Sequence, residues 1–288
     1  MIEMIVVMVV VALLVSLLLP AVHRVLEASR RTSCVNNLRQ IGLAMQQVES
    51  NQGGFPDCPN HVIEILPYLD QAPLYQQYDE QRRQGVDVTV NERLFANQVI
   101  TVYQCPSDPA SGRGNNYCAN ISTGWQKYGN DGFLVHMTQG TMRRVEEVPD
   151  GLSNTVMIAE ILQSSPSSHR LRTIWEVHPR FLRPDQLEQF ADSCEQLPLD
   201  PSAFHYNGSN HSRGIPWAML DVSAYYTHVL PPNRPNCTQG PLVMGSFPAG
   251  SFHGGGANAL FGDGHVAFIS ESVDRQAWRD LGSRQQNH

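Results

Sequence analysis

Two histidines and an aspartate near the C-terminus are the side chains best suited to chemistry. The segment 251–268 reads SFHGGGANALFGDGHVAF. Imidazole nitrogens and carboxylate oxygens are common zinc ligands, and a strand directs residues two apart, such as Asp263 and His265, to one face. A metal site here would use His253, Asp263 and His265, with Asp150 or Glu160 as a fourth ligand.

The same segment has the pattern of a β-hairpin. Two short apolar runs, ANALF and HVAFI, are joined by Gly262, Asp263 and Gly264, and Asp-Gly between such runs is a strong hairpin pattern. A turn explains Asp263 and Gly264 without chemistry, and no compact ligand motif accompanies them. We therefore expect no metal ion and no cofactor, with His253 hydrogen-bonded to the glycine loop.

Nucleophilic catalysis has little support in the sequence. No serine or cysteine stands in an elbow such as G-x-S-x-G. The pair Cys58 and His61 is too sparse for zinc without further ligands. We expect that the protein is not an enzyme.

Six cysteines allow fifteen complete pairings, among which sequence alone does not choose. Cys105 and Cys118 flank a loop rich in Gly and Asn, so a disulfide between them is geometrically easy. Buried thiols are the alternative, because a disulfide needs oriented Cβ atoms.

The N-terminal segment has the length and composition of a membrane span. Residues 1–19 are apolar apart from Glu3 and Ser16, and as a helix they cover roughly the hydrocarbon thickness of a bilayer. A cleaved secretory signal is the rival, but it lacks a basic start and a clear cleavage site. Apolar residues then recur every three or four positions, which predicts one helix of about fifty residues, kinked at Pro20.

The remaining chain predicts an α+β body with a mainly antiparallel sheet packed on the long helix. Residues 61–78 read as one or two short helices interrupted at Pro67 and Pro73, and 178–250 as irregular loops. We divide the chain into 1–50, the helix, and 51–288, the body. The expected strands are short and rich in β-branched residues: 99–105, 132–137, 155–162, 173–177 and 265–269.

The charge balance argues against nucleic acid as a partner. The formal net charge is −7, with only 20 Lys and Arg in 288 residues. A phosphate backbone is bound through clustered positive charge, and none is present.

The chain resembles a large family of uncharacterised bacterial proteins that join a prepilin-type N-terminal methylation segment to a C-terminal domain of unknown function. The resemblance rests on segments in order along the chain: CVNNLRQIGLAM, LPYLDQAPLY, CPSDP, NNYCAN, DGLSNTVMIAE, YYTHVLPPNRPNC and HGGGANALFGDGHVAF. Members carry a His and an Asp-Gly pair with nine residues between them (H-x9-DG), here His253, Asp263 and Gly264. In pilins a carboxylate near the start of the helix pairs with a neighbouring subunit. The resemblance implies that Glu3 has this role.

The resemblance implies a type II secretion pseudopilin-like protein in the bacterial inner membrane. Arg24, Arg30, Arg31 and Arg39 follow the span and would alone place the body in the cytoplasm. Prepilins keep that domain outside, and six cysteines favour an oxidising compartment, so we expect a periplasmic or other extracytoplasmic body. The Gly-Phe processing site of prepilins is missing before Glu3, so we expect either an upstream start or no processing.

The expected function is a non-enzymatic surface or secretion-associated protein able to act as a fibre subunit. Its partners would be the lipid bilayer, like subunits and pseudopilus assembly components. A permanently anchored module that binds an extracellular ligand such as a polysaccharide is the alternative. A third hypothesis is a metal-dependent extracytoplasmic enzyme using the His253 region.

Overall fold

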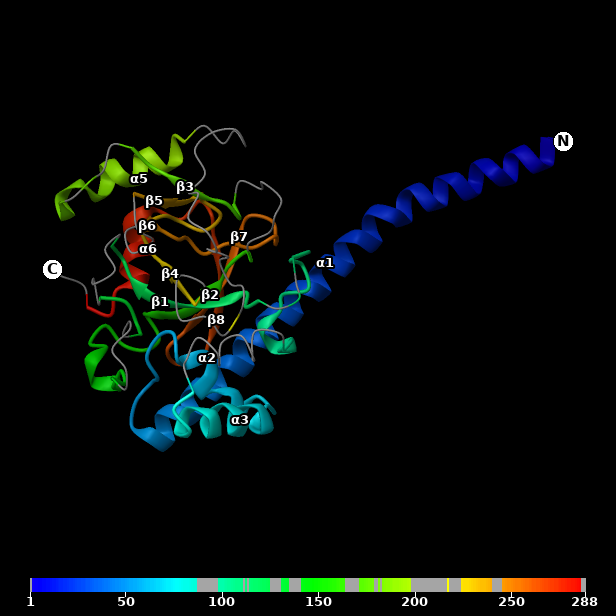
Figure 1. Cartoon of the computed structure of the whole chain (residues 1–288). Coiled ribbons are helices and arrows are strands. Elements are labelled where there is room, and N and C mark those ends of the chain that lie inside the picture. The colour runs from blue at the N-terminus through cyan, green and yellow to red at the C-terminus, as the bar shows by residue number, and fades with distance from the viewer. Residues whose placement is uncertain are drawn as a thin grey trace.

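One very long helix leads into a body of two sheets and short helices (Figure 1). The computed structural model describes residues 2–86, 98–110, 112, 114–124, 131–134, 141–163, 171–178, 181, 183–197, 217, 224–239 and 245–285. The predicted α+β class is confirmed.

The long helix, α1, spans Ile2–Gln52 and continues through Pro20. It ends at Gly53, whose φ of +78° lies in the left-handed region that glycine adopts without steric cost. The Gly53 amide donates to the Glu49 carbonyl at 2.7 Å and closes the last turn. The predicted helix of about fifty residues is therefore present, with 51 residues.

The two halves of α1 have different surroundings. The apolar N-terminal half is exposed and projects away from the body (Figure 1). By length and composition it can cross a membrane once or serve as a signal sequence. From Cys34 onward one face of the helix is buried, and Leu38, Ile41, Met45 and Val48 line it at the predicted spacing.

The larger sheet has the strand order β4 (Tyr225–Thr227), β1 (Tyr117–Ser122), β2 (Val156–Glu160), β7 (Gly256–Phe261) and β8 (Val266–Ser270). β1 runs parallel to β4, and the other neighbours are antiparallel. The sheet is thus mainly antiparallel, as predicted.

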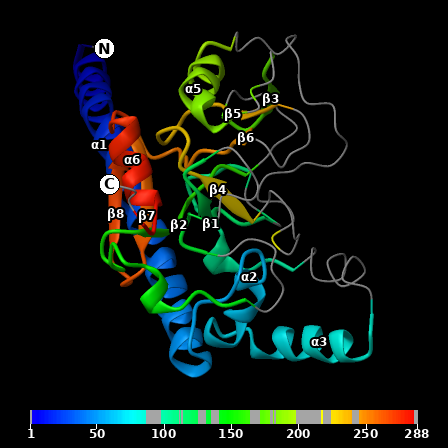
Figure 2. The same cartoon turned by 90° about the vertical axis from the view of Figure 1, so that its left-hand side faces the viewer.

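Helices cover both faces of this sheet. Side chains alternate along a strand, so Tyr117 and Ala119 of β1 join the core under α1, whereas Cys118 joins Trp278 of α6 (Arg275–Gly282) on the other face. Figure 2 shows β7 and β8 between α1 and α6.

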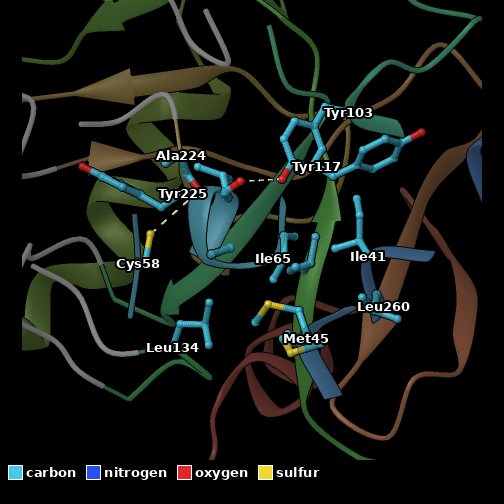
Figure 3. Packing of buried hydrophobic residues seen from close by; sticks show 14 of the residues in the cluster. Ile41, Met45, Cys58, Ile65, Tyr103, Tyr117, Leu134, Ala224, Tyr225 and Leu260 are labelled. Atoms are coloured by element: carbon cyan, nitrogen blue, oxygen red, sulfur yellow. Dashed lines mark hydrogen bonds between the residues drawn. The ribbon is translucent and has the colours of Figure 1, made fainter. Parts of the chain in front are cut away.

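The helix approaches the sheet very closely near β7. Ile41 and Met45 of α1 pack beside Leu260 (Figure 3). A Cβ atom added to Gly42 would stand 2.9 Å from the Leu260 Cδ1 atom, so glycine is what allows this contact.

Short helices follow α1 and close the end of the core. They are α2 (His61–Glu64), the 3-10 helix η1 (Leu66–Tyr68) and α3 (Ala72–Arg83). Pro67 and Pro73 stand in the first turns of η1 and α3, where a missing amide proton costs nothing. Short helices are present as predicted, but there are three where one or two were expected, and each proline lies inside a helix and not at a break.

A second, smaller sheet lies at the far end of the body. It has the order β3 (Ile174–Glu176), β5 (Asn236–Thr238) and β6 (Gly245–Ser246), and it packs beside α5 (Leu187–Glu195), which follows the 3-10 helix η4 (Pro184–Gln186). Short elements thus occupy the described parts of 178–250, which we expected to be irregular. The remainder of that segment lies outside the described residues.

Two strand predictions are wrong where the structure describes them. Residues 99–105 form the 3-10 helix η2 (Thr101–Tyr103), because the Tyr103 side chain turns into the core and its hydroxyl donates to the Val62 carbonyl at 2.6 Å. Residues 132–134 form bends, and 135–137 lie outside the described part. Another 3-10 turn, η3 (Val145–Glu147), precedes β2.

Candidate functional site

A disulfide joins α1 to the body where the helix becomes buried. It links Cys34 of α1 to Cys105, which follows η2, with a Cα–Cα distance of 5.4 Å. The Asn37 amide donates to the Gln104 carbonyl at 2.9 Å one helical turn further on. The helix is therefore fixed to this loop by a covalent bond and a hydrogen bond.

The pairing of Cys105 with Cys118 does not form. Cys118 lies on β1 and faces α6, whereas Cys105 lies in the core under α1, so the sheet stands between them. The cysteines outside the disulfide are all buried: Cys58, Cys118, Cys194 and Cys237.

His253 lies against this disulfide, in the loop that precedes β7. Its side chain is 1% exposed. Its Nδ1 atom is 2.7 Å from a carboxylate oxygen of Glu27 on α1. The backbone amide of His253 donates to the Ser251 hydroxyl at 3.1 Å, and that hydroxyl donates to the Gly256 carbonyl at 2.7 Å. The Ser251 hydroxyl thus links the His253 backbone to Gly256, but the imidazole, which we expected to bond to the glycine loop, faces carboxylates instead.

Glu160, the last residue of β2, lies on the other side of the imidazole. Its Oε1 atom is 3.6 Å from the His253 Nε2 atom. Asn258 of β7 orients the carboxylate, donating its backbone amide at 2.8 Å and its side-chain amide at 3.0 Å. The Cys105 Sγ atom is also 3.6 Å from His253 Nε2.

The two carboxylates control the charge of the imidazole. Burial lowers the pKa of His253, but the attraction of the Glu160 carboxylate, followed by that of Glu27, outweighs burial and raises the pKa overall. The protonated ring can therefore present one N–H group to each carboxylate.

Four potential ligands meet at this point. One atom each from Cys34, Cys105, Glu160 and His253 lies within 4.8 Å of all the others. They come from α1, the loop after η2, the end of β2 and the loop before β7. Sulfur, imidazole and carboxylate together suit thiol–disulfide exchange and the binding of a transition metal.

A buried polar network holds the Cys105 loop in place. The Cys105 amide donates to the Asn116 side chain at 2.9 Å, and Asn116 donates to Asp108 at 2.7 Å. Asp108 also forms a buried ion pair with Arg172. The segments CPSDP and NNYCAN thus position Cys105.

The hairpin around Asp263 is present, with a loop of three residues. The Phe261 amide donates to the His265 carbonyl, and the Gly264 amide to the Phe261 carbonyl, both at 2.9 Å. Gly264 has a φ of +92°. These features identify a turn closed by a glycine bulge.

Asp263 and His265 belong to this turn and not to the group around His253. Their side chains are exposed and contact each other, with 2.6 Å between Asp263 Oδ1 and His265 Nδ1. The ligand set that combined His253 with Asp263 and His265 is therefore not assembled. Of the fourth ligands considered, Glu160 joins His253, and Asp150 lies in the turn before β2.

Glu3 and Glu27 are the two acidic residues of α1 that precede its buried face. Glu3 is exposed in the first turn, and its pairing role stays a prediction. Sequence reasoning missed Glu27 and Cys34 as site residues. Glu27 and Cys34 are seven residues apart, which places them on one face of the helix. This spacing could have indicated that the two residues belong to one site.

Comparisons with known proteins identify a family. Residues 24–276 match the model of a family described as protein of unknown function, DUF1559. No curated protein and no solved structure matches the chain.

Proposed function

The chain belongs to the DUF1559 family, whose function is unknown, and we propose that it is a non-enzymatic, pseudopilin-like protein of the bacterial inner membrane. The exposed half of α1 spans the bilayer once and can pack with the same helix of like subunits. The body is displayed on the extracytoplasmic side.

The contrast between the halves of α1 carries this proposal. The described large apolar side chains from Met4 to Val25 are half or more exposed around the helix, whereas the half after Cys34 is built into the core. An isolated apolar helix of this length is costly in water, so it needs lipid or other helices around it.

The attachment between helix and body supports a role in an ordered assembly. Around the base of the exposed half, the Cys34–Cys105 disulfide, the Glu27–His253 pair and the Arg31 guanidinium stacked 3.8 Å over the Phe268 ring all join α1 to the body. The body therefore cannot swing about the anchor. A fixed angle between helix and body is what a regular fibre of identical subunits requires.

The buried position of His253 supports a non-enzymatic role. Its ring nitrogens face Glu27 and Glu160, and the ring is almost fully covered. A substrate would have to displace these contacts to reach the imidazole.

Photo-crosslinking in cells tests whether the helices pack together. A benzophenone amino acid replacing Val11 on exposed α1 should give adducts of two chains, because neighbouring helices lie within reach in a fibre. The same group at exposed Glu146 of η3 is the matched control for random collision and should give few such adducts.

Glu3→Gln separates assembly from simple crowding. If Glu3 pairs with a neighbouring subunit, the substitution should reduce the Val11 adduct while leaving the chain in the membrane fraction. Equal and low yields from Val11 and Glu146 would contradict assembly and favour a permanently anchored single subunit.

A further inference from the structure

We propose that the reduced chain binds one zinc ion through Cys34, Cys105, His253 and Glu160. This site lies where α1 enters the body and does not depend on the proposed assembly. It departs from our sequence-based expectation of no metal, which considered His253 with Asp263 and His265.

The distances among the ligand atoms suit tetrahedral zinc. Zinc–sulfur bonds of about 2.3 Å and zinc–nitrogen bonds of about 2.0–2.1 Å give tetrahedral edges of about 3.5 Å between S and N and about 3.3 Å between N and O. Cys105 Sγ and Glu160 Oε1 each lie 3.6 Å from His253 Nε2. The Nε2–Oε1 separation is long for a hydrogen bond and close to the edge of such a tetrahedron.

Neighbouring groups already orient each ligand as zinc sites require. A zinc-bound histidine usually donates its second ring N–H to a carboxylate, and His253 Nδ1 is 2.7 Å from Glu27 Oε1. Glu160 is held by both amides of Asn258, and the Cys105 amide is bound by Asn116. With these contacts in place, one atom of each of the four ligands lies within 4.8 Å of all the others.

Opening the site requires reduction of the disulfide. A dithiol supplies two electrons and two protons, the Sγ–Sγ bond breaks, and the dithiol closes to its own disulfide. Zinc then displaces the two thiol protons and the proton on His253 Nε2, all of which pass to solvent, and binds the Nε2 lone pair of the resulting neutral imidazole.

The consequence is that α1 stays attached to the body in both redox states. Under oxidising conditions the disulfide joins Cys34 to Cys105. Under reducing conditions zinc joins the same two residues and adds His253 and Glu160, so the attachment survives loss of the covalent bond.

Metal analysis of the full chain in detergent tests the site. Protein reduced with dithiothreitol, desalted and equilibrated with zinc should retain about one ion per chain, because four ligands close a structural site. Protein oxidised with diamide beforehand should retain almost none. Cobalt in place of zinc should give a sulfur-to-cobalt charge-transfer band that weakens in Cys34→Ser.

Variants distinguish this site from any other. His253→Gln and Glu160→Gln should lose the bound zinc, and Glu27→Gln, which alters the partner of His253 but replaces none of the four ligands, should weaken binding roughly 10- to 100-fold. Glu27 is partly exposed, so this variant should keep its fold, which circular dichroism would verify. The matched control His265→Gln changes an exposed histidine of the turn and should bind zinc as the wild type does.

Two results would overturn the proposal. One is reduced wild-type protein that retains far less than one zinc per chain. The other is folded Glu27→Gln and His253→Gln protein with wild-type zinc affinity.

Discussion

His61 is a buried residue whose side chain has no hydrogen-bond partner on either ring nitrogen within the described structure. It lies on α2 among apolar residues of the core. Burial lowers the pKa of His61 to about 3. The folded chain therefore holds this imidazole neutral, and an unsatisfied buried polar group costs about 1–3 kcal/mol.

We expect His61→Leu to stabilise the protein and to reduce its sensitivity to acid. The pKa of His61 in the folded chain lies below its unfolded value of about 6.5. Below pH 6.5 only the unfolded chain takes up a proton at His61, so the free energy of unfolding falls as the pH is lowered toward 3. Between pH 7.5 and pH 5 this linkage amounts to about 2 kcal/mol. Urea unfolding at both pH values measures it. If the free energy of unfolding of His61→Leu changed between pH 7.5 and pH 5 as much as that of the wild type, His61 would be excluded as the source of the acid sensitivity.

At the scale of elements, the β7–β8 hairpin depends on Gly264. Its φ of +92° is strained for any residue with a Cβ atom, and an added Cβ would stand 2.9 Å from the Gln46 side chain of α1. We expect Gly264→Ala to lower the free energy of unfolding by about 1–2 kcal/mol.

Gly254→Ala provides the matched comparison for this hairpin prediction. Gly254 lies in the same glycine-rich segment, without a positive φ and with open space around its Cα. Gly254→Ala should lower the free energy of unfolding by no more than about 0.5 kcal/mol. Equal losses in thermal or urea unfolding for the two variants would show that the backbone of Gly264 is not the determinant.

Local patterns allowed the sequence to predict some elements and not others. The hairpin and the long helix have periodicities and turn residues that act over a few positions. β1 was not expected, because its NNYCAN segment is polar and its asparagines are satisfied by distant groups, such as Val156 and Gly282 carbonyls for Asn120. The strand predicted at 99–105 failed because burial of Tyr103 overrides its β-branched composition.

The candidate site shows the same division. His253 could be selected from sequence as a candidate site residue because a hairpin turn accounts for Asp263 and Gly264 but not for His253. Its partners could not, since Glu27 is 226 residues away and Glu160 is brought beside it only by the pairing of β2 with β7. Contacts of that range depend on the fold as a whole.

At the scale of the whole molecule, the arginines after the span and the disulfide point to opposite sides of the membrane for the body. Arginines that follow the span favour a cytoplasmic body. Two of them are engaged by the protein itself, Arg31 with Phe268 and Arg30 with Glu27 at 3.9 Å. The disulfide favours an oxidising compartment. We therefore keep the extracytoplasmic body as our proposal.

A single new cysteine on the body tests this orientation. Glu146 of η3 is exposed, whereas the native cysteines are buried, so Glu146→Cys should be the main target of a maleimide reagent on folded protein. For an extracytoplasmic body, a membrane-impermeant maleimide should label Glu146→Cys in intact spheroplasts, while the wild type gives only background. A permeant maleimide should label the variant to the same extent, because the thiol is already accessible from outside. Labelling by the impermeant reagent only after lysis would place the body in the cytoplasm, where thiols are kept reduced and Cys34 and Cys105 would not remain a disulfide.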